Sequence, residues 1–229
     1  MSRYCWCEDS KSGYLFWRVL FGSIYPDVIV ETRNGNSKLV KAAGKITDDG
    51  NQYYIIVDTA MDNPNVFREM KVLKDNISGK NNVSIINIHS FEFLLLSFEL
   101  LEKWVFAETD ELKDKRKDLL EARKQFVKLI TKGGSSDDLN SFKTVFKYQY
   151  TDNSEKIANK LLEEITKNTG FATTKSNIGP CFINSCCDWN NRQEDDICGL
   201  DDNRLSVEAK MKEIVARSVL QSEFTKVGL

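Results

Sequence analysis

The chain has 229 residues, of which 41% are hydrophobic and 10% aromatic, enough for a core in one elaborated domain or two small ones. Its formal net charge of −2 excludes a protein that coats nucleic acid through bulk positive charge, so any such contact must come from a local patch. The start has no apolar signal core, and the apolar run at 93–96 is too short to cross a bilayer. We therefore expect a cytoplasmic protein without membrane contact, whose six cysteines are reduced thiols or metal ligands.

The first hundred residues alternate between two kinds of pattern. Short apolar or β-branched runs predict strands at 3–7, 27–31, 53–57 and 83–88. Amphipathic stretches between them predict helices at 11–24, 37–46 and 65–73. Four strands alternating with three helices are typical of a βα sandwich, so the sequence predicts an α/β fold with a mostly parallel four-stranded sheet.

The second half is helical in pattern. We expect a long helix over 91–131, apolar in its first part and charged in its second, and an amphipathic helix over 153–168. A cysteine-bearing irregular segment follows at 179–202, and a closing helix is expected over 206–221 with Ser206 as its cap. These patterns divide the chain into an α/β domain, residues 1–98, and an α-helical C-terminal region, residues 99–229.

Acidic residues stand where two of the predicted strands end. The run 53–57 is buried on both faces by its pattern and stops at Asp58, with Asp62 and a proline following, while the first strand stops at Glu8. Open α/β sheets place their sites at the carboxyl ends of strands, and clustered carboxylates there are ligands for a divalent cation. The alternative is a polar turn in which Asp62 only starts the next helix.

These residues carry a resemblance to a known family. Glu8 after the first strand, the basic turn 33–38, and the pair Asp58 and Asp62 resemble a toprim domain, the metal-binding unit of topoisomerases, primases and OLD-family nucleases. The resemblance covers roughly residues 3–98 and rests on order and spacing. It implies that Glu8 is a metal ligand or general acid/base and that the Asp pair holds Mg²⁺ or Mn²⁺.

One departure from the family pattern has a geometric consequence. The family's Asp-x-Asp becomes Asp58 and Asp62 with three residues between them. On a continuing strand their Cα atoms would be about 13 Å apart, too far for one cation. The two can share a metal only if 59–61 forms a turn; otherwise Asp58 works with Glu8 and Asp62 is a cap.

Two further residues lie near the expected site. Glu92, at the start of the helix after the fourth strand, sits where the nuclease branch of the family places an accessory acid. His89 is the single histidine of the chain. It is either a structural residue or an acid/base or phosphate contact.

Basic residues supply candidate phosphate contacts. Arg33 and Lys38 belong to the turn after the second strand, and a stretch from 113 to 128 carries a net positive charge. The residues expected to touch nucleic acid on that stretch are Lys115, Arg116, Lys117 and Lys124. The alternative is a solvated helix stabilised by ion pairs between successive turns.

Four cysteines gather in the irregular segment. They are Cys181, Cys186, Cys187 and Cys198. Four thiolates within eighteen residues could hold a structural Zn²⁺, although the usual C-x₂-C spacing is absent. Buried thiols without a metal are the alternative.

Two functional hypotheses follow from the resemblance. The first is a Mg²⁺-dependent nuclease that hydrolyses DNA or RNA, an antiviral effector of bacterial phage defence with Glu8, Asp58, Asp62 and Glu92 as its catalytic residues. The second is a catalytically inactive toprim-like scaffold or sensor subunit of a defence complex. An ATPase or another defence-system subunit is the expected protein partner in either case.

Overall fold

The central sheet has four strands, all parallel. The computed structural model describes residues 1–60, 62–134, 138–140, 142, 153–187, 198–201 and 203–229. The strands are β1 (Arg3–Cys7), β2 (Val28–Thr32), β3 (Gln52–Asp58) and β4 (Val83–Ile88), in the order β2-β1-β3-β4. The predicted α/β class with a four-stranded parallel sheet is confirmed. Its two inner strands, β1 and β3, carry the acidic ends.

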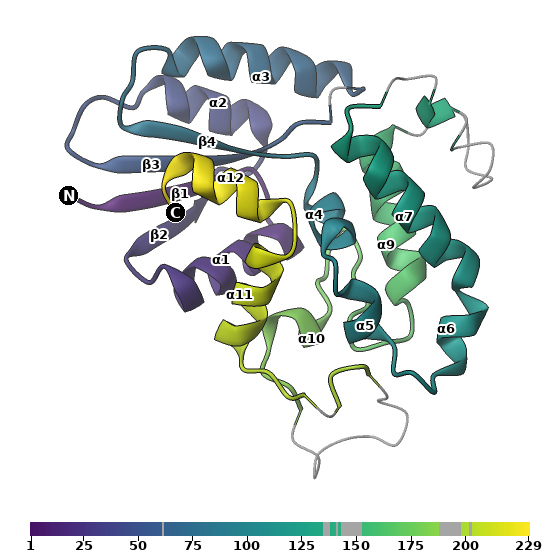
Figure 1. The fold of residues 1–229 in the computed structure, drawn as a ribbon. Coiled ribbons are helices and arrows are strands. Elements are labelled where there is room, and N and C mark those ends of the chain that lie inside the picture. Colours follow the sequence, from purple (N-terminus) through teal and green to yellow (C-terminus); the bar gives the residue numbers. More distant parts are fainter. Residues whose placement is uncertain (61, 135–137, 141, 143–152, 188–197, 202) are drawn as a thin grey trace.

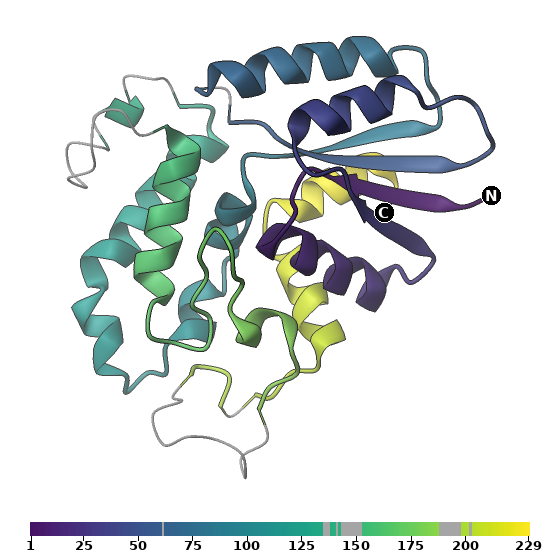
Figure 2. The same ribbon diagram turned by 180° about the vertical axis from the view of Figure 1, so that it is seen from behind.

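Helices cover both faces of this sheet (Figures 1 and 2). One face packs against α2 (Asn36–Gly44) and α3 (Pro64–Ile77), with Ile55 and Val57 of β3 in the shared core. The other face packs against α1 (Ser12–Ile24), α11 (Val207–Ala216) and α12 (Leu220–Val227), and there β3 contributes Ile56. Alternate residues of β3 are thus buried on opposite faces, as its unbroken apolar run predicts.

The remaining helices lie beyond the carboxyl ends of the strands (Figure 1). They are α4 (Phe91–Ser97), α5 (Leu101–Val105), α6 (Glu111–Lys115), α7 (Lys117–Thr131), α9 (Ser154–Thr166) and α10 (Pro180–Ile183). Helix α4 contacts both α7 and α9, which also contact each other. This group of helices forms the wall that faces the ends of β3 and β4.

Two helices that the sequence predicts as continuous are divided into shorter helices in the structure. The expected helix over 91–131 is four helices, because Phe98 and Phe106 take extended conformations and Asp110 accepts from the Leu112 N–H to begin α6. Residues 91–98 are apolar almost all round, so the chain must fold back to bury them. The expected closing helix is α11 followed by α12, and Ser206 does cap α11 by accepting from the Ala209 N–H at 3.2 Å.

The C-terminal helices return to the sheet formed by the N-terminal half. Helix α11 contacts α1, and α12 contacts β4. One hydrophobic core therefore includes Phe21 and Leu94 together with Leu161 and Phe224. The boundary expected after residue 98 does not coincide with a break in this core. No helix in the described ranges is long and apolar enough to span a bilayer.

Candidate functional site

Glu8 and Asp58 lie together at the carboxyl end of the sheet. The parallel pairing of β1 with β3 sets Cys7 beside Ile56, so Glu8, which follows β1, lies near Asp58, the last residue of β3. The Asp58 backbone N–H donates to Glu8 Oε1 at 3.2 Å.

Asp9 brings a third carboxyl group to this end of the sheet. Its Oδ2 accepts from Trp17 Nε1 at 3.1 Å. A Cβ on Gly13 would lie 2.3 Å from the Asp9 Cγ, so glycine is required there for the carboxyl group to rest on the first turn of α1. The N-terminus of a helix favours negative charge, and α1 has no acidic residue of its own in that turn.

Helices α4 and α9 add two more acids. Glu92 lies in the first turn of α4, where its Oε1 accepts from Asn159 Nδ2 at 3.2 Å. Glu155, in the first turn of α9, interacts electrostatically with Glu92 and with Asp58. We call these five residues the acidic cluster: Glu8, Asp9, Asp58, Glu92 and Glu155.

Four members of the cluster, Glu8, Asp9, Asp58 and Glu92, have raised pKa values. Burial is the largest cause for each, and repulsion by neighbouring carboxylates adds to it. The pKa of Glu8 rises to about 8 and that of Asp9 to about 6. The pKa of Asp58 is raised well above its usual value by burial and then by Glu8 and Asp9. Glu8 is therefore protonated near neutral pH unless a cation neutralises it.

The donor chemistry of the cluster fits a hard divalent cation. Mg²⁺ and Mn²⁺ are bound by carboxylate oxygens, which this cluster supplies in excess. Across the residues that the structure describes, no three His, Cys, Asp or Glu side chains surround a single point as metal ligands do. Side-chain rotation within the cluster would therefore have to accompany cation binding.

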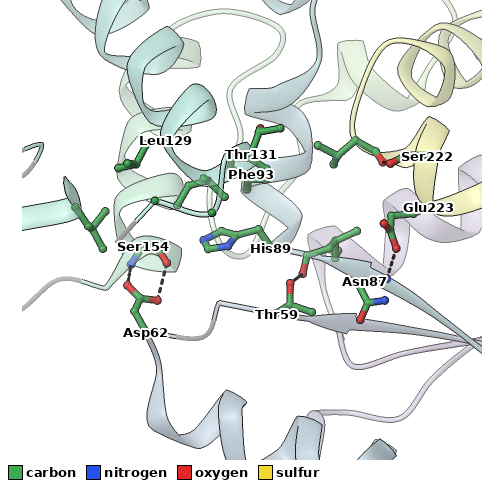
Figure 3. A pocket seen from close by; sticks show the side chains of 16 residues that line it. Thr59, Asp62, Asn87, His89, Phe93, Leu129, Thr131, Ser154, Ser222 and Glu223 are labelled. Carbon is green, nitrogen blue, oxygen red and sulfur yellow. Dashed lines mark hydrogen bonds between the residues drawn. The ribbon is translucent and has the colours of Figure 1, made fainter. Parts of the chain in front are cut away.

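Asp62 does not join the cluster. Its carboxylate accepts from the backbone N–H and the hydroxyl of Ser154, both at 2.6 Å (Figure 3). The Asn63 N–H donates to the Ala60 carbonyl at 2.9 Å, so the chain does turn after β3. The turn nevertheless directs Asp62 to the start of α9, while Asn63 caps α3. Asp58 thus pairs with Glu8, and Asp62 acts as a cap for a helix distant in sequence.

His89 follows β4 and lies outside the cluster. Its Nε2 is buried and has no hydrogen-bond partner among the described residues. The ring meets that of Phe93 edge-on at 5.1 Å between centroids. Burial lowers the pKa of His89 to about 4, so the imidazole is neutral at physiological pH.

The arginines of the predicted basic stretch are structural. Arg116 is 8% exposed and donates to the carbonyls of Ile165 and Lys167, which end α9. Arg123 is also buried, and it donates to the carbonyls of Leu96 and Phe98, which end α4. Both guanidinium groups are therefore bonded to backbone carbonyls of the protein rather than exposed for contact with a phosphate.

The lysines of this region remain on the surface. Lys115 pairs with Glu111 at 3.4 Å, and Lys117 and Lys124 are exposed on α7. Lys38 is exposed on α2. Arg33 stacks on the Trp6 ring at 3.8 Å and bonds Glu31, so its charge is engaged beside β2.

The four cysteines line one small cavity. Cys181, Cys186, Cys187 and Cys198 surround a space of about 20 Å³ together with Phe171 and Leu200. Cys186 Sγ accepts from the Leu205 N–H at 3.2 Å. Residues 188–197 and 202 of the predicted segment 179–202 lie outside the described residues. Zinc at these cysteines stays a prediction.

Three members of the site were not predicted as site residues from the sequence. The sequence does contain a signal for Asp9 as a site residue, because it follows Glu8 directly at the end of a predicted strand. No sequence pattern indicates Glu155 or Asn159 as site residues, because they reach the cluster only through the packing of α9 on α4. Comparison with protein-family models, curated proteins and solved structures found no match. The fold and site define an α/β protein with a half-buried cluster of carboxyl groups at its strand ends.

Proposed function

We propose that this chain is a divalent-metal-dependent phosphodiesterase that hydrolyses DNA or RNA. The observation that carries the proposal is the convergence of five carboxyl groups, four of them with raised pKa values, at the carboxyl ends of β1 and β3. Mutually repulsive acids in a half-buried position destabilise a fold, and binding of a cation offsets that repulsion. The toprim resemblance of Glu8 and Asp58 supports the same function.

Each acid has a role that follows from its surroundings. Glu8 and Asp58 would hold the cation, with Asp9 and Glu92 on either side as further ligands. A bound Mg²⁺ supplies charge neutralisation at a phosphate and lowers the pKa of a water molecule. Trp17 fixes the orientation of Asp9, and Asn159 that of Glu92. Without a cation, Glu8 has a pKa of about 8, and binding of the cation would favour its ionised form.

Nucleic-acid binding is proposed for the exposed lysines of α7. Phosphate contacts give affinity without reading sequence, so little base specificity is expected from this surface. Replacing Lys117 and Lys124 by Glu should weaken oligonucleotide binding and reduce the slope of log K against log salt by about 2, one for each lost phosphate contact. Equal salt slopes for the variant and the parent would exclude α7 as the binding surface. The proposed place in phage defence, with an ATPase or another subunit as partner, rests on the family resemblance.

The test of the enzymatic proposal is cleavage by matched variants. The parent should cut labelled single- or double-stranded DNA or RNA in Mg²⁺ or Mn²⁺, and EDTA should stop it. Glu8→Gln and Asp58→Asn should lower the rate at least a hundredfold while the protein stays folded by circular dichroism. Glu99→Gln, an exposed acid outside the cluster, should cut like the parent. Unchanged cutting by Asp58→Asn would exclude this site.

A non-catalytic toprim-like scaffold or sensor is the second candidate. Two observations favour it: Asp62 is committed to Ser154, and the described carboxylates do not surround one point. Such a protein would bind a defence-complex partner through its helical half without holding metal. Absence of Mn²⁺ binding together with absence of cleavage on every substrate would select the scaffold.

A further inference from the structure

A cavity of about 670 Å³ lies beside the acidic cluster. It is bounded by Thr59 and His89 after β3 and β4, by Phe93 of α4, by Ser154 of α9 and by Ser222 of α12 (Figure 3). Small-molecule sites in proteins commonly have volumes of about 300–1,000 Å³. The cavity is therefore large enough for an organic ligand, and its walls come from five separate parts of the chain.

The cavity and the acidic cluster are built from residues that are neighbours in the sequence. At three places, one residue belongs to the cluster and its immediate neighbour in sequence lines the cavity. The three pairs are Asp58 and Thr59, Glu92 and Phe93, and Glu155 and Ser154. Adjacent Cα atoms are about 3.8 Å apart, so at these three places the backbone that bounds the cavity also carries a residue of the cluster.

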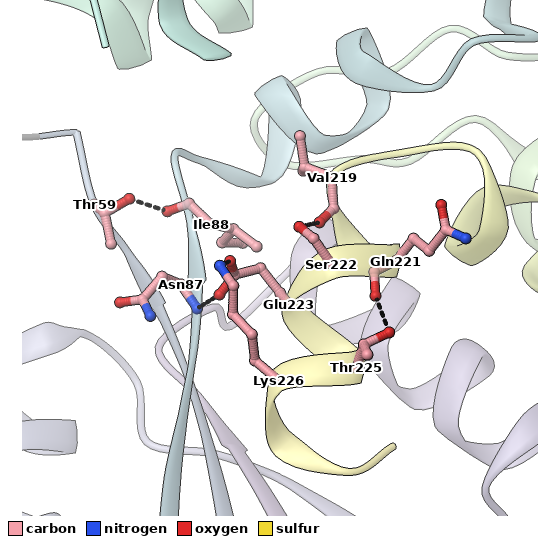
Figure 4. Close-up of polar contacts among 9 residues, drawn as sticks. All are labelled: Thr59, Asn87, Ile88, Val219, Gln221, Ser222, Glu223, Thr225 and Lys226. Atoms are coloured by element: carbon pink, nitrogen blue, oxygen red, sulfur yellow. Dashed lines mark hydrogen bonds and ion pairs between the residues drawn. The ribbon is translucent and has the colours of Figure 1, made fainter. Parts of the chain in front are cut away.

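The polar groups of the cavity do not suit an anion. Its described lining contains neither lysine nor arginine. The carboxylates present are already engaged: Asp62 by Ser154, and Glu223 by the Asn87 N–H at 3.1 Å and by Lys226 (Figure 4). A phosphate would meet these carboxylates without a compensating cation. The cavity instead suits a neutral ligand.

The remaining groups favour a flat ring with polar edges. His89 is neutral, so its imidazole offers one donor and one acceptor, and its Nε2 has no partner among the described residues. The hydroxyls of Thr59 and Ser222 donate to the Ile88 and Val219 carbonyls and keep their lone pairs for a ligand. Phe93, together with aliphatic side chains of α7, supplies an apolar surface for the faces of a ring.

We propose that this cavity binds a nucleobase, either one belonging to a nucleic acid held at the acidic cluster or one belonging to a free nucleoside. A nucleobase has apolar faces and donor and acceptor atoms along its edge, which are the complements of these walls. The choice of a nucleobase among heteroaromatic rings rests on the proposed function. Binding of nucleosides can be measured without metal and without cleavage, so failure of one proposal does not entail failure of the other.

The test is calorimetric titration of the metal-free protein with adenosine, guanosine, cytidine, uridine and thymidine. At least one nucleoside should bind with a millimolar or lower Kd. Ser222→Trp, which fills the cavity from α12, should weaken that binding at least tenfold. Thr225→Trp is the matched control, because Thr225 is exposed on the same helix and does not line the cavity; it should bind within twofold of the parent.

A second variant addresses the imidazole. His89→Phe keeps a ring against Phe93 but removes both nitrogens, and it should weaken nucleoside binding about tenfold. Absence of binding by all five nucleosides at 5 mM, or unchanged binding by both Ser222→Trp and His89→Phe, would overturn the proposal. Competition between the nucleoside and an oligonucleotide would assign the cavity to a base of the nucleic acid; simultaneous binding would assign it to a free nucleoside.

Discussion

The pH dependence of stability should reveal the acidic cluster directly. The pKa of Glu8 is raised from 4.5 to about 8 on folding, mainly by burial and then by Asp9. Between these two values the folded protein keeps a proton that the unfolded chain has lost, so the free energy of unfolding falls as the pH rises. The stabilising contribution is complete below the unfolded pKa and is lost as the pH passes the folded pKa.

The magnitude follows from the size of this shift. One retained proton gives a slope of about 1.4 kcal/mol per pH unit and a total of up to about 5 kcal/mol over the whole interval. Because the Glu8 carboxyl group is partly exposed to solvent, about 5 kcal/mol is an upper limit for its contribution to the free energy of unfolding. For a chain of this size, 1 kcal/mol corresponds to a change in Tm of about 2–4 °C.

Glu8→Gln removes the titrating group with almost no change in volume. Denaturant unfolding of the metal-free parent and variant between pH 5 and 8 should show the parent losing stability and the variant losing at least 1 kcal/mol less per pH unit. Saturating Mg²⁺, at about 100 times its Kd, should stabilise the parent by about 2.7 kcal/mol and leave the variant almost unchanged. If the free energy of unfolding depends on pH equally in the two proteins, Glu8 does not have a raised pKa in the folded state.

Three further variants test how the site is built. Gly13→Ala places a Cβ against the carboxyl group beside it and should weaken Mn²⁺ binding in calorimetric titrations, whereas Gly22→Ala in the same helix has open space and should not. Asp62→Ala should destabilise the fold by about 1–2 kcal/mol in denaturant unfolding through loss of the α9 cap while leaving Mn²⁺ affinity unchanged; a fall in affinity would make Asp62 a ligand. Arg116→Ala should cost about 2–4 kcal/mol in the same unfolding assay because two buried carbonyls lose their charged donor, and the exposed Lys115→Ala should stay within about 0.5 kcal/mol of the parent.

The sequence predicted the sheet better than the helices. The strands expected at 3–7 and 83–88 have the same bounds as β1 and β4, because short apolar runs bounded by polar turns are a local signal. The continuous helix expected over 91–131 is wrong, because its breaks at Phe98 and Phe106 arise when bulky residues on all sides of the chain must be buried. That requirement depends on tertiary packing and has no local pattern.

Some features of the site could likewise be predicted from the sequence, and others depend on tertiary packing. The proximity of Glu8 and Asp58 follows from the adjacency of two parallel strands, which sequence patterns indicate. The roles of Asp62 and Arg116 depend on where α9 begins and ends in space, since the first bonds Ser154 and the second the carbonyls of Ile165 and Lys167. A charged residue on a predicted helix looks the same in sequence whether it faces solvent or a helix end.

The most direct measurement is a crystal structure of the protein soaked in Mn²⁺, with anomalous difference density collected near the manganese edge. We expect a peak at the acidic cluster, about 2.0–2.3 Å from oxygens of Glu8 and Asp58, and its loss in Asp58→Asn. Absence of a peak at saturating Mn²⁺, with the hydrogen bond from the Asp58 N–H to Glu8 intact, would show that the cluster is not a metal site.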